Sequence, residues 1–237
     1  MPSPLVGTIS IRERHIGFLK QYNDHTFKLV HMNSVRVPGY ELRGPSRSPP
    51  RRSSADEGEK LSNSLSRTRA HIYELSLCNP WEFFVTLTID PARHNRYDLH
   101  GTYKRLSKWF NNYNSRQDAN IRYLLVPEPH KDDAWHFHGL MFGLPLSHLT
   151  LFTLSDNIPN HIKDMLRSGR QIYNWPAYAA SFGFVTVEMI QDLDRCAAYM
   201  TKYITKELQA SSIELNHHLY YCSQRLKRAE TLYRGPL

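Results

Sequence analysis

The chain has 237 residues, of which 41% are hydrophobic, so it can bury one substantial core. Its 30 Lys and Arg exceed its 22 Asp and Glu, and the resulting net charge of +8 favours a polyanionic partner such as nucleic acid. No apolar run approaches the roughly 18 residues of a membrane span, and Cys78, Cys196 and Cys222 show neither metal-type spacing nor a disulfide framework. These features argue against a membrane protein or a disulfide-stapled secreted domain, and they favour a reducing cytoplasm.

Composition predicts three parts along the chain. Residues 1–43 carry short β-like runs, such as Thr8–Ile11 and Phe27–Val30, and are expected to form a β-rich extension. Residues 44–68 are rich in Pro, Ser and Arg, a composition that buries little apolar surface, and are predicted to be a flexible linker. Residues 69–237 are predicted to form the main domain.

The main domain is predicted to run helix, strand, helix, strand, strand, helix, strand, helix. In a strand at residues 83–89, one face is expected to carry Phe83, Val85, Leu87 and Ile89. Thr86 and Thr88 are expected on the other face, where their hydroxyls could meet substrate. An apolar helical stripe runs through residues 99–113, and residues 184–189 form a late strand. Short strands mixed with helices that cover one face predict an α+β fold.

The most informative stretch is Trp135-His136-Phe137-His138-Gly139, which lies in a β-like run. Residues two apart in a strand point to the same face, so both imidazoles are expected side by side. Residues 129–133 read as a hairpin turn, and folding about residue 132 places Glu128 opposite His136. Two imidazoles and one carboxylate that converge in this way form a metal-binding set with open coordination positions. A lone histidine pair in a strand is more often a packing feature, so this hypothesis needs support from elsewhere in the chain.

That support comes from residues 193–208, which contain no Gly or Pro and suit a helix. At about 100° per residue, one narrow face of this helix carries Tyr199, Lys202, Tyr203 and Lys206. A separate apolar stripe provides the packing face: Leu193, Ala197, Met200, Ile204 and Leu208. The alternative is an amphipathic helix with solvated lysines and incidental tyrosines.

These residue types suit phosphodiester chemistry. A tyrosine oxygen can attack a DNA phosphodiester and hold the broken strand covalently. A divalent cation polarises phosphoryl oxygens, and a nearby lysine neutralises charge that develops in the transition state. Two tyrosines one helical turn apart can alternate in successive strand transfers.

With these motifs the chain resembles rolling-circle replication initiators, the HUH endonucleases of phages, plasmids and related elements. Residues 84–88 resemble the first motif of that family, and His136-Phe137-His138 with Glu128 resembles its metal motif. Tyr199-x-x-Lys202-Tyr203-x-x-Lys206 resembles the nucleophile helix of the two-tyrosine type. The motif order differs from that of relaxases, in which the tyrosine precedes the histidines. The resemblance covers about residues 70–230.

The resemblance implies a central antiparallel sheet with RRM-like, ferredoxin-like connectivity, on which the histidine strand faces the tyrosine helix. It implies a site-specific single-strand endonuclease that uses Mg²⁺ or Mn²⁺, forms a 5′-phosphotyrosine link and frees a 3′-OH for a host polymerase. Thr86, Thr88, Arg225 and Lys227 are expected to contact DNA. The partners would be single-stranded DNA at a replication origin and, because the sequence has no G-x-x-x-x-G-K-[ST] pattern, a host helicase in the bacterial cytoplasm.

Three alternatives remain open from the sequence. A transposase of the same chemistry would share all three motifs and differ only in its DNA substrate. A non-catalytic RRM-like binding protein would use Trp135, Phe137, Tyr199 and Tyr203 as stacking platforms for bases. A metal-dependent hydrolase without covalent chemistry would make the tyrosines dispensable.

Overall fold

The computed structural model describes residues 16–32, 54–202 and 219–236, and the chain divides into two compact units. The terminal unit comprises residues 1–54 and 228–237, and the central unit comprises residues 55–227. No described helix is long and apolar enough to cross a membrane. All three cysteines are free thiols, which agrees with their scattered spacing.

The terminal unit contains a three-stranded antiparallel sheet. Its strands are β1 (Ile16–Gln21), β2 (Phe27–Met32) and β10 (Glu230–Pro236), in the order β10-β1-β2. The turn between β1 and β2 is closed by Asn23, whose side-chain oxygen accepts hydrogen bonds from the backbone N–H groups of His25 and Thr26 at 3.0 and 2.7 Å. The predicted strand at 27–30 lies within β2, whereas Thr8–Ile11 lies outside the described residues.

The central unit alternates helices with strands along the chain. In order, its elements are α1 (Ser54–Cys78), β3 (Phe83–Leu87), α2 (Leu99–Gln117), β4 (Arg122–Pro129), β5 (Trp135–Phe142), the 3₁₀ turn η1 (Leu146–His148), β6 (Thr150–Leu151), α3 (Asn160–Arg167), β7 (Ile172–Asn174), α4 (Pro176–Ser181), β8 (Val185–Met189), α5 (Leu193–Lys202) and β9 (Tyr221–Cys222).

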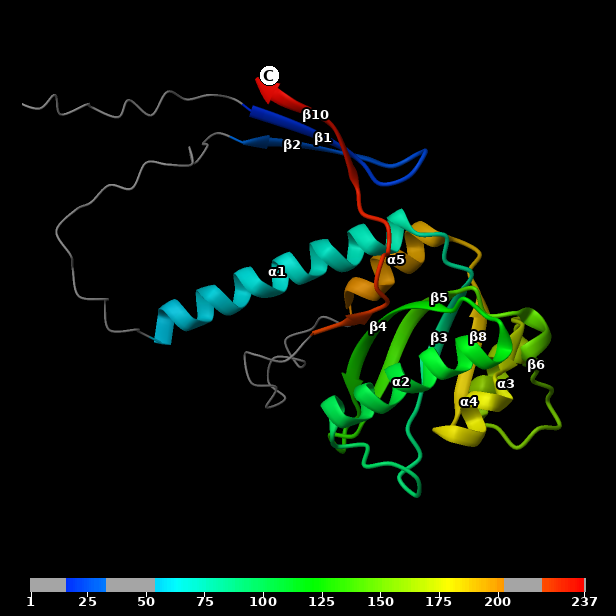
Figure 1. Cartoon of the computed structure of the whole chain (residues 1–237). Helices are drawn as coiled ribbons and strands as arrows, with labels where there is room; N and C mark the ends of the chain where they lie inside the picture. The colour runs from blue at the N-terminus through cyan, green and yellow to red at the C-terminus, as the bar shows by residue number, and fades with distance from the viewer. Residues whose placement is uncertain (1–15, 33–53, 203–218, 237) are drawn as a thin grey trace, which may run out of the picture. The chain divides into compact units, whose positions relative to one another are not determined.

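The seven strands of this unit form one antiparallel sheet in the order β6-β7-β8-β3-β5-β4-β9 (Figure 1). Its four central strands, β8-β3-β5-β4, have the strand order 4-1-3-2 of a ferredoxin-like sheet when numbered along the chain. The predicted α+β fold with this connectivity is therefore confirmed. β5, which carries the histidines, lies between β3 and β4, with paired strands on both sides.

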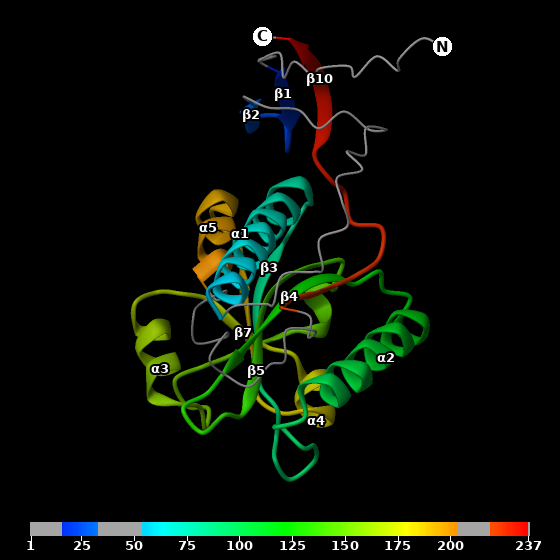
Figure 2. The same cartoon turned by 90° about the vertical axis from the view of Figure 1, so that its left-hand side faces the viewer.

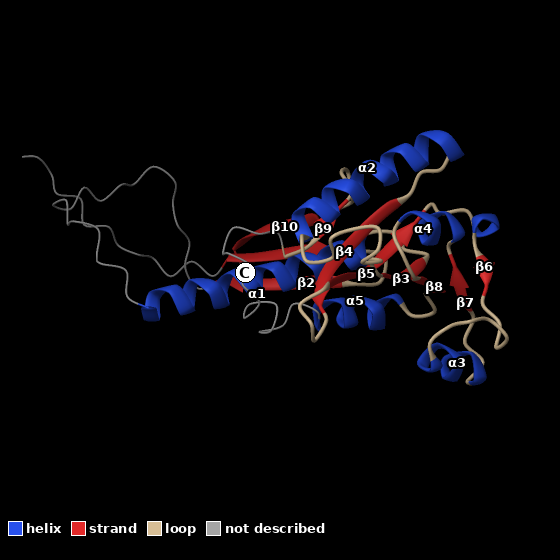
Figure 3. Cartoon of the chain, turned by 90° about the horizontal axis from the view of Figure 1, so that it is seen from below, coloured by secondary structure: helices blue, strands red, loops and turns tan. Residues whose placement is uncertain are grey.

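Helices cover both faces of this sheet. α2 and α4 lie on one face, while α1, α3 and α5 lie on the other (Figure 3). On the α2 face, the ring of Phe110 stacks on Tyr123 of β4 at a centroid distance of 4.7 Å. On the opposite face, α1 and α5 lie side by side, as two perpendicular views show (Figures 1 and 2). In β3 the predicted alternation holds, because Phe83, Val85 and Leu87 are buried in the core.

The structure differs from the predicted division of the chain at two places. α1 begins at Ser54, so residues 54–68 are helical rather than part of a flexible linker. The Ser-rich composition is misleading here, because helix formation depends on burying apolar residues such as Leu65, Ile72 and Leu75 against the rest of the unit. β10 pairs with β1 in the terminal unit, although the sequence pattern assigned residues 69–237 to one domain. Pairing between strands that lie some 200 residues apart leaves no local pattern in a single sequence.

Gly139 allows β5 to lie tightly against β4. A Cβ atom at this position would lie 2.4 Å from Leu125 Cδ2 and 2.6 Å from the backbone oxygen of Leu124, which the sheet holds in place. We expect Gly139→Ala to lower the free energy of unfolding by about 1–3 kcal/mol, because overpacking must displace the strand. Urea denaturation measures this loss. Wild-type stability of Gly139→Ala would contradict this close packing.

Candidate active site and metal centre

The register of the β4–β5 hairpin assembles the predicted metal group. Glu128 lies directly opposite His136, as the hairpin pattern predicted, and His138 follows on the same face. The Glu128 carboxylate oxygen Oε2 lies 3.0 Å from His136 Nε2 and 2.8 Å from His138 Nε2, and the two Nε2 atoms are 2.9 Å apart. Three potential ligand atoms from two adjacent strands therefore converge on one point.

These separations suit a divalent ion. Two donor atoms bound at right angles to one ion, each at about 2.1 Å, lie about 3.0 Å apart, which is the edge of an octahedron. The three separations of 2.8–3.0 Å match this spacing. The remaining corners would stay open for water or substrate oxygens. The donor set and its spacing therefore fit a metal ion.

Thr86 of β3 orients one of the imidazoles. Its hydroxyl oxygen lies 3.1 Å from His138 Nδ1, the ring nitrogen that faces away from Glu128. When His138 Nδ1–H donates to this hydroxyl, the lone pair of Nε2 is directed toward the convergence point. His136 is held differently, because the ring of His130 stacks on it at a centroid distance of 4.0 Å. His136 Nδ1 is buried and has no hydrogen-bond partner among the described residues.

The electrostatics of the group favour the protonation states that bind metals. The neighbouring imidazoles of His136 and His138 lower the pKa of the Glu128 carboxyl to about 2. Burial lowers the pKa of His138 and outweighs the raising effect of the neighbouring carboxylate. Burial also lowers the pKa of His130, and the nearby His136 adds to the effect. At neutral pH the group thus offers an ionised carboxylate and a neutral His138 imidazole, the forms in which these side chains coordinate metals.

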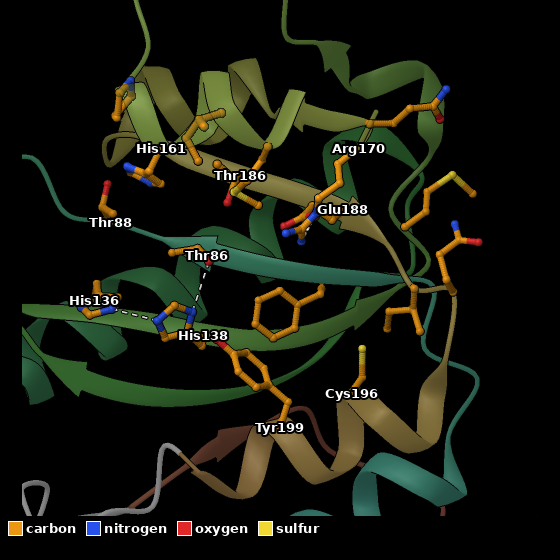
Figure 4. A pocket seen from close by; sticks show the side chains of 18 of the residues that line it. Thr86, Thr88, His136, His138, His161, Arg170, Thr186, Glu188, Cys196 and Tyr199 are labelled. Carbon is orange, nitrogen blue, oxygen red and sulfur yellow. Dashed lines mark hydrogen bonds and ion pairs between the residues drawn. The ribbon is translucent and has the colours of Figure 1, made fainter. Parts of the chain in front are cut away.

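Tyr199 extends from α5 toward this group (Figure 4). The ring of Phe84, on β3, stacks on His138 at 6.0 Å and contacts the Tyr199 ring at 5.7 Å, so that one aromatic side chain touches both. Tyr199 itself is 44% exposed, whereas Ala197 and Met200 of the same helix are fully buried. α5 therefore packs through the predicted apolar stripe and leaves the tyrosine accessible.

A large open cleft of about 1350 Å³ adjoins the metal group and continues across β8 toward α3. His136, His138 and Tyr199 lie along one side of it, and His161 of α3 and Arg170 lie along the other (Figure 4). Arg170 is paired with Glu188 of β8. The cleft is open to solvent and is lined by residues of β3, β5, β8, α3 and α5.

The other predicted residues have varied positions. Lys202 lies one turn beyond Tyr199 on α5, with its ammonium 5.6 Å from the centre of the Tyr199 ring. Thr88 lines the cleft, but its hydroxyl donates to the backbone oxygen of Phe184 at 2.6 Å. Arg225 and Lys227 are exposed on the segment after β9 and do not line this cleft. Tyr203 and Lys206 lie outside the described residues.

The sequence interpretation missed the residues that support the metal group. From the sequence, Phe84 was expected only as part of a strand motif. Its ring contacts His138 of β5 and Tyr199 of α5, so the contact joins three elements. From the sequence, His130 was expected in a turn, although its ring packs on His136. A partial signal exists in each case: Phe84 has the same parity as Thr86, and His130 lies two residues beyond Glu128.

Comparison with known proteins gives one match. A family model described as replication-associated protein ORF2/G2P matches residues 82–208, which is more than half of the chain. The matched segment extends from β3 past α5 and contains Glu128, both histidines and Tyr199. No curated protein and no solved structure is significantly similar to the chain.

The hydrogen bond from Thr86 provides a test of the metal centre. We expect Thr86→Val to weaken Mn²⁺ binding about 10- to 100-fold, because the valine keeps the shape of the side chain but cannot fix the His138 ring. Mn²⁺ titration followed by electron paramagnetic resonance measures the affinity. Thr88→Val is the matched control, since the Thr88 hydroxyl bonds to a backbone oxygen and touches no ligand. Equal Mn²⁺ affinities for the two variants would contradict this role of Thr86.

Proposed function

Because the chain belongs to the replication-associated protein ORF2/G2P family, we propose that it starts rolling-circle DNA replication by nicking one DNA strand at an origin. The observation that carries this proposal is the position of Tyr199. An exposed tyrosine reaches toward a three-donor metal group, and Phe84 contacts both. A nucleophilic oxygen beside a site for a divalent ion is the arrangement that tyrosine attack on a phosphodiester requires.

In the proposed reaction the Tyr199 hydroxyl oxygen attacks the phosphorus of the scissile phosphodiester. The phenol proton passes to solvent, the new O–P bond links the tyrosine to the 5′ phosphate, and the bond from phosphorus to the 3′ oxygen breaks. The leaving oxygen takes up a proton and becomes a free 3′-OH. The bond energy is conserved in the phosphotyrosine link, so the strand can later be transferred back to a 3′-OH without another energy source. The free 3′-OH then primes a host polymerase, while a host helicase separates the strands.

Glu128, His136 and His138 would hold Mg²⁺ or Mn²⁺, and the ion when bound supplies positive charge that polarises a phosphoryl oxygen. Thr86 and Phe84 fix the position of His138, and Thr88 is a proposed contact for the DNA at the wall of the cleft. Lys202, beside the Tyr199 ring, is positioned to neutralise phosphate charge during the attack. Arg225 and Lys227 are proposed to contact the DNA backbone away from the scissile bond.

Tyr203 is proposed as a second nucleophile, with Lys206 as its cationic neighbour. Residues four apart on a continuous helix lie on the same face, so a helix that continues beyond Lys202 would place Tyr203 next to Tyr199. A tyrosine already joined to DNA cannot attack again, and rolling-circle replication needs one cleavage to begin and another to release the unit-length circle. A second tyrosine on one face would meet that need.

Two of the sequence alternatives are less compatible with these observations. A non-catalytic RRM-like protein would require Trp135 and Phe137 as stacking platforms, but they are 8% and 0% exposed and cannot receive bases. A transposase shares the site, and the family match favours replication instead.

The tyrosines can be tested one at a time. We expect Tyr199→Phe and Tyr203→Phe each to retain some nicking, or one of them to retain it all, and the double variant to form no covalent DNA adduct. Phenylalanine keeps the ring and removes only the nucleophilic oxygen, so loss of packing is small. A denaturing gel of the protein with circular single-stranded DNA of its own replicon and Mn²⁺ shows nicks and adducts. Tyr97→Phe, at an exposed loop position, is the control. Adduct formation by the double variant would overturn the assignment.

The metal ligands should separate cleavage from binding. We expect His136→Ala or His138→Ala to abolish nicking while leaving most DNA affinity, because affinity comes mainly from contacts with backbone phosphates. Glu128→Ala should weaken metal binding and regain part of its activity at raised Mn²⁺ concentration. Nicking and DNA binding are measured on the same preparations. Full nicking by the wild-type protein in EDTA would contradict a metal-dependent reaction.

A further inference from the structure

The positive charge of the chain is concentrated in the terminal unit. Residues 1–54 and 228–237 contain 11 Lys and Arg against 4 Asp and Glu, a net charge of +7. The central unit, which is much longer, contains 19 Lys and Arg against 18 Asp and Glu, a net charge of +1. The unit that carries the metal group and Tyr199 is thus almost neutral, and the terminal unit carries nearly all of the charge that favours a polyanion.

The sheet of the terminal unit gathers three of these cations on one face. In the β1–β2 register Phe18 lies opposite Val30 and Lys20 lies opposite Lys28, while β1 and β10 pair Phe18 with Arg234. Residues 18 and 20 of β1 share a face, so their partners do too. The position of Arg234 agrees, since its guanidinium lies 5.0 Å from the centre of the Phe18 ring. We call Lys20, Lys28 and Arg234, with Phe18 beneath Arg234, the basic face.

The opposite face of the same sheet has a different character. It carries Leu19 with its partners Leu29 and Tyr233, and Phe27 beside them. The Lys and Arg residues of β1, β2 and β10 all lie on the face that carries Phe18 and Val30, so their positive charge is presented in one direction.

The pairing of Lys20 with Lys28 is unfavourable in the free protein. Like charges directly opposite one another on adjacent strands repel and destabilise the pair. Neither lysine forms an ion pair with any carboxylate within residues 16–32 and 230–236. Lys28 and Arg234 are exposed and Lys20 is half-buried, so the charges remain accessible to a ligand. A bound anion would relieve this repulsion, and a row of anions would relieve it along the whole face.

We propose that the basic face is a second DNA-binding site, which holds the phosphate backbone of single-stranded DNA without regard to base sequence. The choice of DNA as the polyanion rests on the proposed function. Cations that contact phosphates supply sequence-independent affinity through counterion release. The central unit, with its nearly balanced charge, then performs the chemistry, and the terminal unit retains the strand. The Phe18 ring lies against the Arg234 guanidinium, and Arg234 is exposed and therefore accessible to a phosphate.

The test compares two sets of charge changes in the full chain. The first variant combines Lys20→Gln, Lys28→Gln and Arg234→Gln. The matched control combines Lys104→Gln, Arg105→Gln and Lys108→Gln, which removes the same charge from exposed positions of α2, on the sheet face away from the metal group. Both sets are made in a Tyr199→Phe background. Fluorescence anisotropy with a random-sequence single-stranded oligonucleotide in EDTA measures affinity over a series of NaCl concentrations, so cleavage contributes nothing.

We expect the basic-face variant to lose affinity on the order of 10- to 100-fold, with a salt slope lower by about 2, because each lost contact removes roughly 0.7 from the slope. The control should keep the wild-type affinity and slope. A charge-preserving variant, Lys20→Arg with Lys28→Arg and Arg234→Lys, should bind as the wild type does, which separates loss of charge from loss of folding.

Equal salt slopes for the basic-face variant and the control would overturn the inference, and so would loss of binding in the charge-preserving variant. These outcomes are independent of the nicking reaction. A protein that nicks normally but shows no effect of the basic face contradicts only this inference, whereas a protein that shows the effect but never nicks contradicts only the proposed function.

Discussion

The hydrogen-bonded register between β4 and β5 is the constraint on which the rest of the site depends. Side chains alternate between the two faces of a strand, so a slip by one residue would turn both histidines into the core and expose Phe137. The register that places Glu128 opposite His136 is also the one that buries Leu125 and Phe137 on the α2 face. The pairing of β4 with β5 thus both buries the core and assembles the metal group. Gly139 allows the two strands to approach closely enough to pair in this way.

The second constraint is the aromatic contact between the sheet and α5. The candidate metal ligands and the proposed nucleophile lie on different elements, so their relative position requires a rigid contact between them. Phe84 provides it, since its ring touches both His138 and Tyr199. Burial of Ala197 and Met200 fixes the rotation of α5 about its axis, and that rotation directs Tyr199 toward the metal group. Packing of apolar residues therefore positions the polar side chains of the candidate site.

The sequence predicted the parts of the site that follow from periodicity. Parity within a strand and a short hairpin were sufficient to group Glu128, His136 and His138, and a period of 3.6 separated Tyr199 from the core stripe of its helix. The ferredoxin-like order of the central strands was predicted from the family resemblance rather than from periodicity. Neither periodicity nor the family resemblance could predict contacts between distant elements. These include the contact of Phe84 with Tyr199 and that of Thr86 with His138.

Contacts between residues far apart in the sequence also explain why the observed division of the chain differs from the predicted one. The first half of α1 has a composition typical of a linker, and its helix depends on tertiary contacts farther along at Ile72 and Leu75. β10 finds its partner β1 across nearly the whole chain, so the basic face exists only after folding. Its three cations come from strands at both ends of the sequence, and no local charge pattern would have grouped them.

The central claim is that a tyrosine of α5 becomes joined to DNA, and peptide mapping of the trapped adduct tests it most directly. Trypsin cleaves after Arg195, Lys202 and Lys206, so the two candidate tyrosines fall in separate peptides, 196–202 and 203–206. We predict that mass spectrometry finds the nucleotide on one of these peptides in the wild-type protein, and only on peptide 196–202 in Tyr203→Phe. A nucleotide on any other peptide, or no covalent adduct from a preparation that nicks DNA, would contradict the account.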